Sequence, residues 1–419
     1  MATKFLVGAR FFLKMKLLKV KYREIEQIPQ LTAKKQFKQD FSGSSPAPFI
    51  GRYGYPHINI GFLSPQFSGE IEHYDSPKLW SKGKFAVGTI AELRSNLVNS
   101  RTSGNVLQPR TGQAGISIGN SRFLDVIQEV GLASKAVELE VNLKEIPKLQ
   151  PKSEKEIIPF GPQGELLKAI ITANPKVDSR VERVFSDTDL KAASAVLSLY
   201  QKGFEENFLT KLISVGGIGL KHNRKLVPTR WSITMIDDTL GKELIKEVKD
   251  FSVGDYQLYC GGEWGNYYLV LFFPEIWSYE LFEMYLDYKV NPWSKEGNFY
   301  STDYEDYSGR KEYAQECAGG YYACRLGLLE KMKENKRQQS ALVLRFITPD
   351  YTIPLEVWVC REATRKSLAE KPIGFASEEL MLRYASELIQ KKFGFDLGLL
   401  LEKSKLLRGK KEQKRLGEF

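Results

Sequence analysis

The segment 254–274 alternates aromatic with polar residues. A period of two puts successive side chains on opposite faces of a β-strand, so this pattern predicts a two- or three-strand antiparallel meander with Gly261-Gly262 as a turn. Helix-type patterns lie on both sides of it, at 181–212 and, interrupted by Gly319-Gly320, at 312–336. The chain is therefore predicted to be an α+β protein in which helices pack on a mixed sheet.

Other segments add to this predicted α+β fold. A helix followed by a strand is predicted over 119–150, and strands are predicted over 340–348 and 357–360. Two more helices are predicted towards the C-terminus, at 362–369 and 377–392. No internal repeat accompanies these elements.

The chain has 419 residues, of which 42% are hydrophobic, so it can bury one large core or two ordinary ones. No linker rich in Pro, Gly and Ser divides it. We therefore expect its two main regions, 30–290 and 291–402, to share strands and to pack as one compact body. A flexible hinge near residue 295 would contradict this expectation.

Membrane and secretory segments are not expected. The longest uncharged apolar stretches, such as 267–274, are much shorter than the roughly 20 residues that cross a bilayer, and the chain does not open on a signal-peptide pattern. Four cysteines without a short paired spacing predict reduced thiols and no zinc motif. These features favour an intracellular protein, which we expect in the cytoplasm and associated with the nucleoid.

The formal net charge of +10 is concentrated at the two ends of the chain. Residues 1–23 carry seven basic residues and no acid, and residues 403–419 carry seven basic residues and two acids, so the rest of the chain is close to neutral. These end charges could contact phosphate or could serve solubility. The basic amphipathic arm 1–29 is compatible with a helix packed on the body, a nucleic-acid arm or a membrane-surface anchor.

The basic segment 403–419 ends in three side chains spaced three residues apart, Gln413, Leu416 and Phe419. In a single 3₁₀ turn they share one face, and two apolar anchors with one amide suit a groove on a partner protein. The motif resembles the PCNA-interacting peptide, or PIP box, by which replication and repair proteins attach to the sliding clamp. It lacks the second adjacent aromatic that many such boxes carry. We therefore expect PCNA as a partner.

Two glycine-containing segments carry most of the candidate binding residues. The segment 49–61 places Gly51 and Gly54 among Arg, Tyr and His side chains, as either a ligand loop or a plain hairpin requires. The segment 214–232 has three glycines within four positions, followed by cations that could cradle phosphate. It matches neither a Walker A motif nor a complete GxGxxG fingerprint.

Six motifs occur in the order found in a known family. They are GRYGYP (51–56), YDSPKLW (74–80), NRKLVPTRWSIT (223–234), GNYYLVL (265–271), GGYYACR (319–325) and VWVCREATR (357–365). With them the chain resembles the archaeal Nre family of DNA repair proteins from about residue 40 to residue 400, and its C-terminal motif resembles the NreA branch. The resemblance implies a role in the response to DNA damage and interstrand crosslinks, with recruitment by the clamp, and names no biochemical activity.

One departure from the family concerns the N-terminus. Many members begin with a cysteine-rich segment interpreted as a zinc finger, whereas no cysteine precedes Cys260 in this chain. The resemblance therefore carries no metal site over to the arm 1–29.

The candidate nucleotide- or DNA-binding residues combine Arg for phosphate, aromatic rings for bases and amides for base edges. They are Arg52, Tyr53, Tyr55, His57, Asn223, Arg224, Arg230, Trp231, Tyr267 and Arg325. Trp231 and the tyrosines could instead fill the core. Acid-only Mg²⁺ binding rests on Asp75, Asp237, Asp238 or Glu263, which could equally be helix caps, ion pairs or surface charges, so no metal site is assigned.

Three functions remain open from the sequence. The preferred one is a DNA repair factor that is recruited to the sliding clamp and that binds or acts on damaged DNA. The second is a nucleotide- or DNA-modifying enzyme, either a metal-dependent nuclease or an NAD-dependent ADP-ribosyltransferase, with Arg52, His57 and Glu263 as possible participants. The third is a non-catalytic repair scaffold. Catalytic residues and cofactors stay unassigned.

Overall fold

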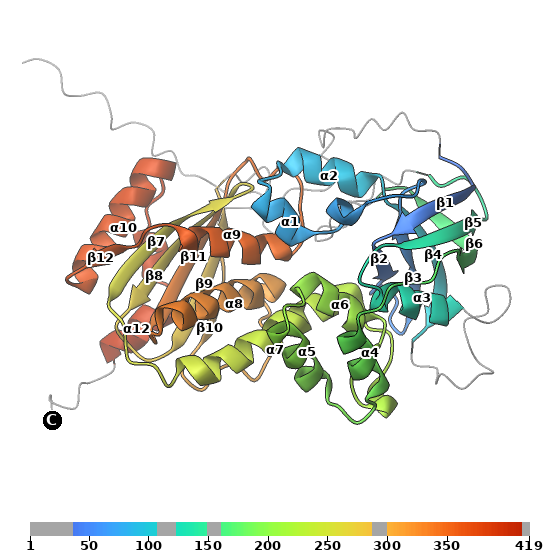
Figure 1. Cartoon of the computed structure of the whole chain (residues 1–419). Helices are drawn as coiled ribbons and strands as arrows, with labels where there is room; N and C mark the ends of the chain where they lie inside the picture. The colour runs from blue at the N-terminus through green and yellow to red at the C-terminus, as the bar shows by residue number, and fades with distance from the viewer. Residues whose placement is uncertain (1–36, 107–122, 149–160, 287–299, 413–419) are drawn as a thin grey trace, which may run out of the picture.

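The structure is a computed structural model, and it describes residues 37–106, 123–148, 161–286 and 300–412 (Figure 1). Within these residues the strands form two six-stranded sheets, each with helices packed on it. The predicted α+β class with mixed sheets is confirmed. The arm 1–29, the surroundings of residue 295 and the predicted clamp-binding residues Gln413, Leu416 and Phe419 lie outside the described residues.

The first sheet has the order β1-β5-β6-β4-β3-β2, in which β4 and β6 are parallel and the other neighbours are antiparallel. Its edge strands β1 and β2 are separated in sequence only by Pro46, so the sheet curls around the core that α3 completes. We call this unit the N-terminal lobe. Its elements are β1 (Asp40–Ser45), β2 (Ala47–Ile50), β3 (His57–Ser64), β4 (Val98–Asn105), α3 (Phe123–Leu132), β5 (Val137–Leu143) and β6 (Gln163–Ile171).

The second sheet has the order β10-β9-β11-β8-β7-β12, with β9 and β11 as its parallel pair. Three strands precede residue 290 and three follow it, so the two sequence regions build one sheet. We call this sheet with its covering helices the C-terminal lobe. The strands are β7 (Tyr256–Glu263), β8 (Asn266–Phe273), β9 (Ser278–Tyr285), β10 (Tyr300–Glu305), β11 (Ser340–Ile347) and β12 (Ile373–Phe375).

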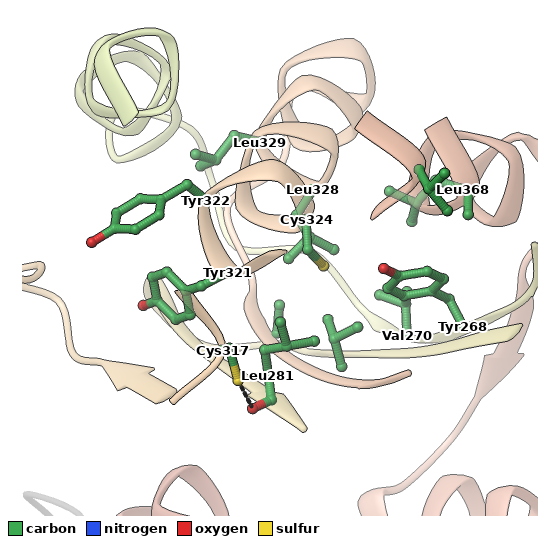
Figure 2. Packing of buried hydrophobic residues seen from close by; sticks show 14 of the residues in the cluster. Tyr268, Val270, Leu281, Cys317, Tyr321, Tyr322, Cys324, Leu328, Leu329 and Leu368 are labelled. Carbon is green, nitrogen blue, oxygen red and sulfur yellow. Dashed lines mark hydrogen bonds between the residues drawn. The ribbon is translucent and has the colours of Figure 1, made fainter. Parts of the chain in front are cut away.

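Helices cover both faces of the second sheet. Along the central strand β8, Tyr268, Val270 and Phe272 belong to one core and the alternate residues belong to another, because both faces are buried. Figure 2 shows Tyr268 and Val270 below Leu368, which belongs to the helix Trp358–Ala369 (α9). One face packs on α8 (Ala318–Asn335) and α9 (Trp358–Ala369), and the other on α10 (Glu378–Phe393), α11 (Gly398–Leu401) and α12 (Lys405–Glu412).

The remaining helices connect the two lobes. Trp80 and Ile90 lie between β3 and β4 in sequence, yet both side chains are buried in the core of the C-terminal lobe. A separate helical layer has its own core and ends in the long helix α7, which packs on α8. These elements are η2 (Glu72–Tyr74), α1 (Pro77–Lys82), α2 (Val87–Ser95), α4 (Ser179–Ser186), α5 (Ala192–Gln201), α6 (Glu206–Ser214), η3 (Lys221–Asn223) and α7 (Thr229–Val248).

Two local predictions were wrong. Residues 357–360 were predicted as a strand from their β-branched and aromatic side chains, but from Trp358 they form the first turn of α9, where burial of these side chains outweighs strand propensity. Gly261 and Gly262 were predicted as a turn but lie inside β7. The turn is made by Trp264 and Gly265, whose φ angles are +54° and +69°.

Among the described residues, none of the helices combines the length and the apolar character that crossing a membrane requires.

Candidate functional site

A pocket rich in cations lies where the N-terminal lobe meets α2, α6 and α7. We call it the basic pocket. Its volume is about 90 Å³, which suits a small anion and is less than the roughly 150 Å³ of a cavity that holds an aromatic ring. Its charged lining consists of five cations and two carboxylates, which leaves three positive charges in excess when all are ionised. They are Arg52, Arg94, Arg101, Lys211 and Arg230, with Asp75 and Glu356.

The loop between β2 and β3 forms one wall of the basic pocket. Gly54 has a φ of +79°, and a Cβ there would lie 2.6 Å from the carbonyl oxygen of His57, so the turn requires glycine. The backbone N–H of Ile50 donates to the Thr229 hydroxyl at 3.3 Å. This bond joins β2 to the start of α7 and brings Arg52 next to Arg230 on the pocket wall.

Helix α7 presents its first turn to the basic pocket. Thr229, Arg230 and Ile233 line it, so the positive end of a 20-residue helix faces the same space as the cations. The partial positive charge at a helix N-terminus favours bound anions. This end of α7 therefore adds to the field of the arginines.

Asp75 connects lining residues of the basic pocket that come from α2 and α6. Its carboxylate pairs with the buried guanidinium of Arg94, and its backbone oxygen accepts from the Asn207 amide at 2.8 Å. On α6, the ammonium of Lys211 donates to the carbonyl oxygen of Pro46 at 3.1 Å. These contacts fix cations from two separate elements, Arg94 of α2 and Lys211 of α6, around one space.

The positive charges of the basic pocket are unfavourable in the absence of a ligand, because the cations are partly buried and close to one another. Burial lowers the pKa of Lys211, and the charge of Asp75 opposes that effect. Burial also lowers the pKa of Arg230, and the neighbouring charge of Arg52 lowers it further. A bound anion would relieve both effects, because it would supply the countercharge that the burial of cations requires.

Glu356 is the unusual acid of this site. Its φ is +76°, in the left-handed region that costs a non-glycine residue roughly 1–3 kcal/mol. Burial raises the pKa of its carboxyl to about 7, although the charges of Arg94 and Arg230 act in the opposite direction. A carboxyl that titrates near neutral pH can take up or release a proton under ordinary conditions.

Aromatic side chains lie next to residues of the basic pocket: Tyr53 lines it, Trp231 directly follows the lining residue Arg230 on α7, and Tyr313 lies close enough to Arg230 to affect its pKa. Tyr53 is 57% exposed, and the Arg52 guanidinium lies 4.9 Å from the centre of its ring. Trp231 is 46% exposed and contacts Tyr55, with ring centroids 5.1 Å apart. Tyr313 is also 46% exposed and bonds to the Thr234 side chain on α7. We call Tyr53, Tyr55, Trp231 and Tyr313 the aromatic rim.

The structure thus brings five of the sequence candidates together and separates the rest. Arg52, Tyr53 and Arg230 line the basic pocket, while Trp231 follows Arg230 on α7 and contacts Tyr55. The others lie elsewhere, and they are His57, Asn223, Arg224, Tyr267 and Arg325.

Three of these outlying candidates lie in the N-terminal lobe or in the loop before α7. His57 is exposed at the start of β3, and Asn223 is exposed in the turn η3. The guanidinium of Arg224 donates to the carbonyl oxygens of Phe185, Asp187 and Gly219 at 2.6 to 2.8 Å. It therefore ties the glycine-containing loop to the end of α4.

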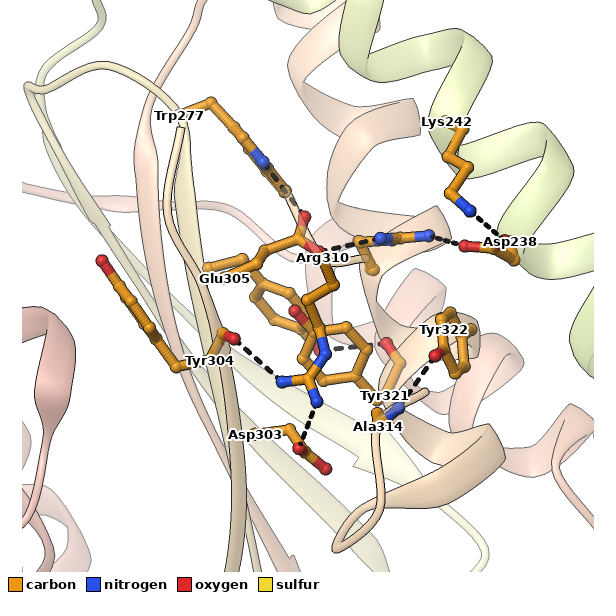
Figure 3. Close-up of polar contacts among 12 residues, drawn as sticks. Asp238, Lys242, Trp277, Asp303, Tyr304, Glu305, Arg310, Ala314, Tyr321 and Tyr322 are labelled. Atoms are coloured by element: carbon orange, nitrogen blue, oxygen red, sulfur yellow. Dashed lines mark hydrogen bonds and ion pairs between the residues drawn. The ribbon is translucent and has the colours of Figure 1, made fainter. Parts of the chain in front are cut away.

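The other two outlying candidates belong to the C-terminal lobe. Arg325 is buried and pairs with Glu305 at 2.8 Å and with Asp238 at 2.6 Å. Figure 3 shows Glu305 and Asp238 in this network, with Lys242 also on Asp238. Tyr267 packs edge-on against Phe393 with ring centroids 5.3 Å apart.

The acids considered for Mg²⁺ are each engaged in an ion pair. Asp75 pairs with Arg94, Asp237 with Arg361, Asp238 with Arg325 and Lys242, and Glu263 with Lys366. Among the described residues, no group of three or more His, Cys, Asp or Glu side chains is arranged to hold a metal ion.

Comparison with known proteins gives two matches to family models. Residues 21–293 match the model described as archaeal Nre, N-terminal, and residues 305–419 match the model described as archaeal Nre, C-terminal. The chain belongs to the archaeal Nre family.

Relatives in this family align over most of their lengths. The chain is 35% identical to the DNA repair protein NreB of Archaeoglobus fulgidus, covering 94% of this chain and 95% of the relative. It is 34% identical to the DNA repair protein NreA of Haloferax volcanii, covering 78% of this chain and 77% of that protein. It is 33% identical to NreA of Archaeoglobus fulgidus over 83% of this chain and 85% of that protein. No solved structure gives a significant match.

Within this Nre chain, Lys211 and Glu356 were not among the sequence candidates. In α6, Lys211 is surrounded in sequence mostly by apolar residues. This pattern is only a weak indication that the lysine side chain enters a buried space. Glu356 follows Pro354 and Leu355 with no motif around it, so no sequence signal marks its position. Arg94 and Arg101 line the pocket as well, although no recognisable motif marks either of them.

Proposed function

We propose that this protein is a DNA repair factor that binds DNA through the basic pocket and its aromatic rim, and that the motif Gln413, Leu416 and Phe419 recruits it to the sliding clamp PCNA. The relatives named as DNA repair proteins support the repair role. The observation that supports DNA binding is the convergence of five cations on one pocket that the exposed Tyr53 also lines, with the exposed Trp231 next to the lining residue Arg230.

The chemistry of this site suits a nucleic acid for two reasons. Arginine guanidinium groups match phosphate oxygens in charge and geometry, and exposed aromatic rings provide faces on which bases stack without sequence preference. The body of the protein is close to neutral, so the attraction for phosphate is local and not a property of the whole surface.

DNA binding is tested by titrating a labelled single-stranded oligonucleotide at several salt concentrations. We expect Arg230→Gln to weaken binding about tenfold and to reduce the slope of log affinity against log salt by about 1, because one phosphate contact is lost. The matched control is Arg183→Gln, which removes one positive charge from an exposed position on α4. Equal affinities and slopes for the two variants would remove the basic pocket as the DNA site.

Clamp recruitment is tested by calorimetry with purified PCNA. We expect micromolar binding by the intact protein and its loss in the double variant Leu416→Ala, Phe419→Ala, because both apolar anchors are removed. Binding of equal strength by the two proteins, or by neither, would exclude the C-terminal motif as the attachment point.

A second candidate function is a DNA- or nucleotide-modifying enzyme, and Glu356 is the observation that favours it. Its carboxyl lies in the same pocket as the cations and its pKa of about 7 suits a general acid or base at neutral pH. The sequence-based participant Glu263 pairs with Lys366 and is not part of the pocket lining. Product formation that requires a divalent metal or NAD, and that Glu356→Gln abolishes, would favour this function over binding alone.

A further inference from the structure

The basic pocket and the aromatic rim occupy adjacent positions but suit different parts of a nucleotide. The pocket's volume of about 90 Å³ accepts a phosphate group and is too small for a base. The rim residues Tyr53 and Trp231 are about half exposed, so parts of their rings are accessible from solvent. A nucleotide would therefore place its phosphate inside and its base outside, on the rim.

The cations approach the pocket from several elements and not along a line. Arg52 comes from the β2–β3 loop, Arg94 from α2, Arg101 from β4, Lys211 from α6 and Arg230 from α7. An internal phosphodiester carries one negative charge, and its strand must leave the site in two directions. A terminal phosphate monoester carries about 1.5 to 2 negative charges, offers three strong acceptor oxygens and leaves the site in one direction.

Buried polar atoms on the pocket side also lack a protein partner. Arg94 is 5% exposed, and its Nε has no hydrogen-bond partner in the protein. Ser214 is also buried, and its hydroxyl likewise has no hydrogen-bond partner. Both residues line the basic pocket. Buried donors without acceptors are costly, so these two groups favour an incoming ligand that is rich in acceptor oxygens.

We propose that the basic pocket binds the phosphate monoester at the end of a single DNA strand while the terminal base stacks on the aromatic rim. This inference rests on the proposed DNA binding and specifies the part of the DNA that is recognised. It assigns Arg52 and Lys211 to the phosphate, and Tyr53 and Trp231 to the base. A deoxynucleoside monophosphate shares the chemistry of the strand end and would compete for the same place.

The test compares four oligonucleotides of one sequence in a fluorescence anisotropy assay with the full chain. They are a linear strand with a 5′-phosphate, one with a 3′-phosphate, one with hydroxyls at both ends, and a circular strand used as an unlabelled competitor. We expect at least one phosphorylated strand to bind tenfold or more tightly than the hydroxyl-ended and circular strands. The strand that does so identifies which end is recognised, and a deoxynucleoside monophosphate should displace it.

Variants connect this preference to the pocket. Arg52 is half-buried in the β2–β3 loop and Lys211→Met keeps the side-chain volume, so thermal melts should confirm that each variant is folded before binding is measured. Both should lose the preference for a phosphorylated end, whereas the control Arg183→Gln should keep it. Loss of the preference in the control as well would contradict the assignment to this pocket.

The possible failures of the two proposals are distinct. Equal affinity for phosphorylated, hydroxyl-ended and circular strands would overturn end recognition while leaving DNA binding in place. Absence of binding to every strand would overturn the proposed DNA binding, and end recognition with it.

Discussion

Glu356 joins two uncommon features in one residue of the basic pocket. Its backbone adopts a left-handed φ of +76°, and burial raises the pKa of its carboxyl from 4.5 to about 7. A left-handed backbone and a buried carboxyl each raise the free energy of the folded state. Such features persist where the surrounding structure enforces them, commonly at functional sites. In this protein they occur at the place where the cations also converge.

The raised pKa of Glu356 predicts how stability depends on pH. The pKa of this carboxyl is about 7 in the folded protein and 4.5 in the unfolded chain, so the folded state binds the proton more tightly. As the pH rises from 4.5 to about 7, the carboxyl loses its proton and the folded state loses this group's contribution to stability. We expect Glu356→Gln to be more stable than the natural protein by roughly 2 kcal/mol at pH 8.

The measurement is urea unfolding of both proteins at pH 8 and at pH 4.5, where the difference should largely disappear. The matched control is Glu312→Gln at an exposed position, which should change the free energy of unfolding little at either pH. A difference between Glu356→Gln and the natural protein that is the same at both pH values would show that the carboxyl does not titrate as described.

At the scale of single elements, the hairpin of β7 and β8 depends on its two-residue turn. Trp264 and Gly265 both have positive φ angles, which is the geometry that matches the twist of two antiparallel strands. The Trp264 indole N–H donates to the carbonyl oxygen of Phe85 at 2.8 Å, so the turn is also attached to the segment after α1. This long-range contact lets a tryptophan occupy a position where glycine or asparagine is usual.

A substitution in this turn should destabilise the protein strongly. A Cβ on Gly265 would lie 2.3 Å from the backbone nitrogen of Tyr351, and its φ of +69° disfavours any other residue. We expect Gly265→Ala to lower the free energy of unfolding by about 3 kcal/mol in urea titrations. Gly374→Ala is the control, because a Cβ there meets nothing within 4 Å, and a similar loss in both would contradict the explanation.

The turn also shows where sequence patterns reach their limit. Strand periodicity correctly located the hairpin, and β5, β11 and α10 lie where local patterns predicted them. The position of the turn and the helical state of 358–360 depend on distant contacts, which a local pattern does not contain. For the same reason Lys211 and Glu356 were missed, whereas Arg52 and Arg230 were found through motifs that carry recognisable chemistry.

At the scale of the whole molecule, the lobes do not correspond to continuous segments of the sequence. The second sheet takes strands from both sides of residue 290, and α1 and α2 leave the N-terminal lobe to bury Trp80 and Ile90 in the C-terminal lobe. The expectation of two regions packed as one body came from the absence of a linker. The pocket between the lobes could not be predicted, because it depends on how β2, α2, α6 and α7 meet.

Helix α12 determines how far the C-terminal motif can reach. Its first turn is held by Glu280, which accepts from the backbone N–H groups of Lys405 and Leu406 at 2.9 and 3.0 Å, and Leu406 and Leu407 are buried against the sheet. Seven residues follow Glu412, and seven residues span at most about 25 Å. In the proposed attachment, a sliding clamp bound at Phe419 would lie within about 25 Å of the end of α12 and thus beside the C-terminal lobe. DNA that passes through the clamp would then approach the body from a limited range of directions.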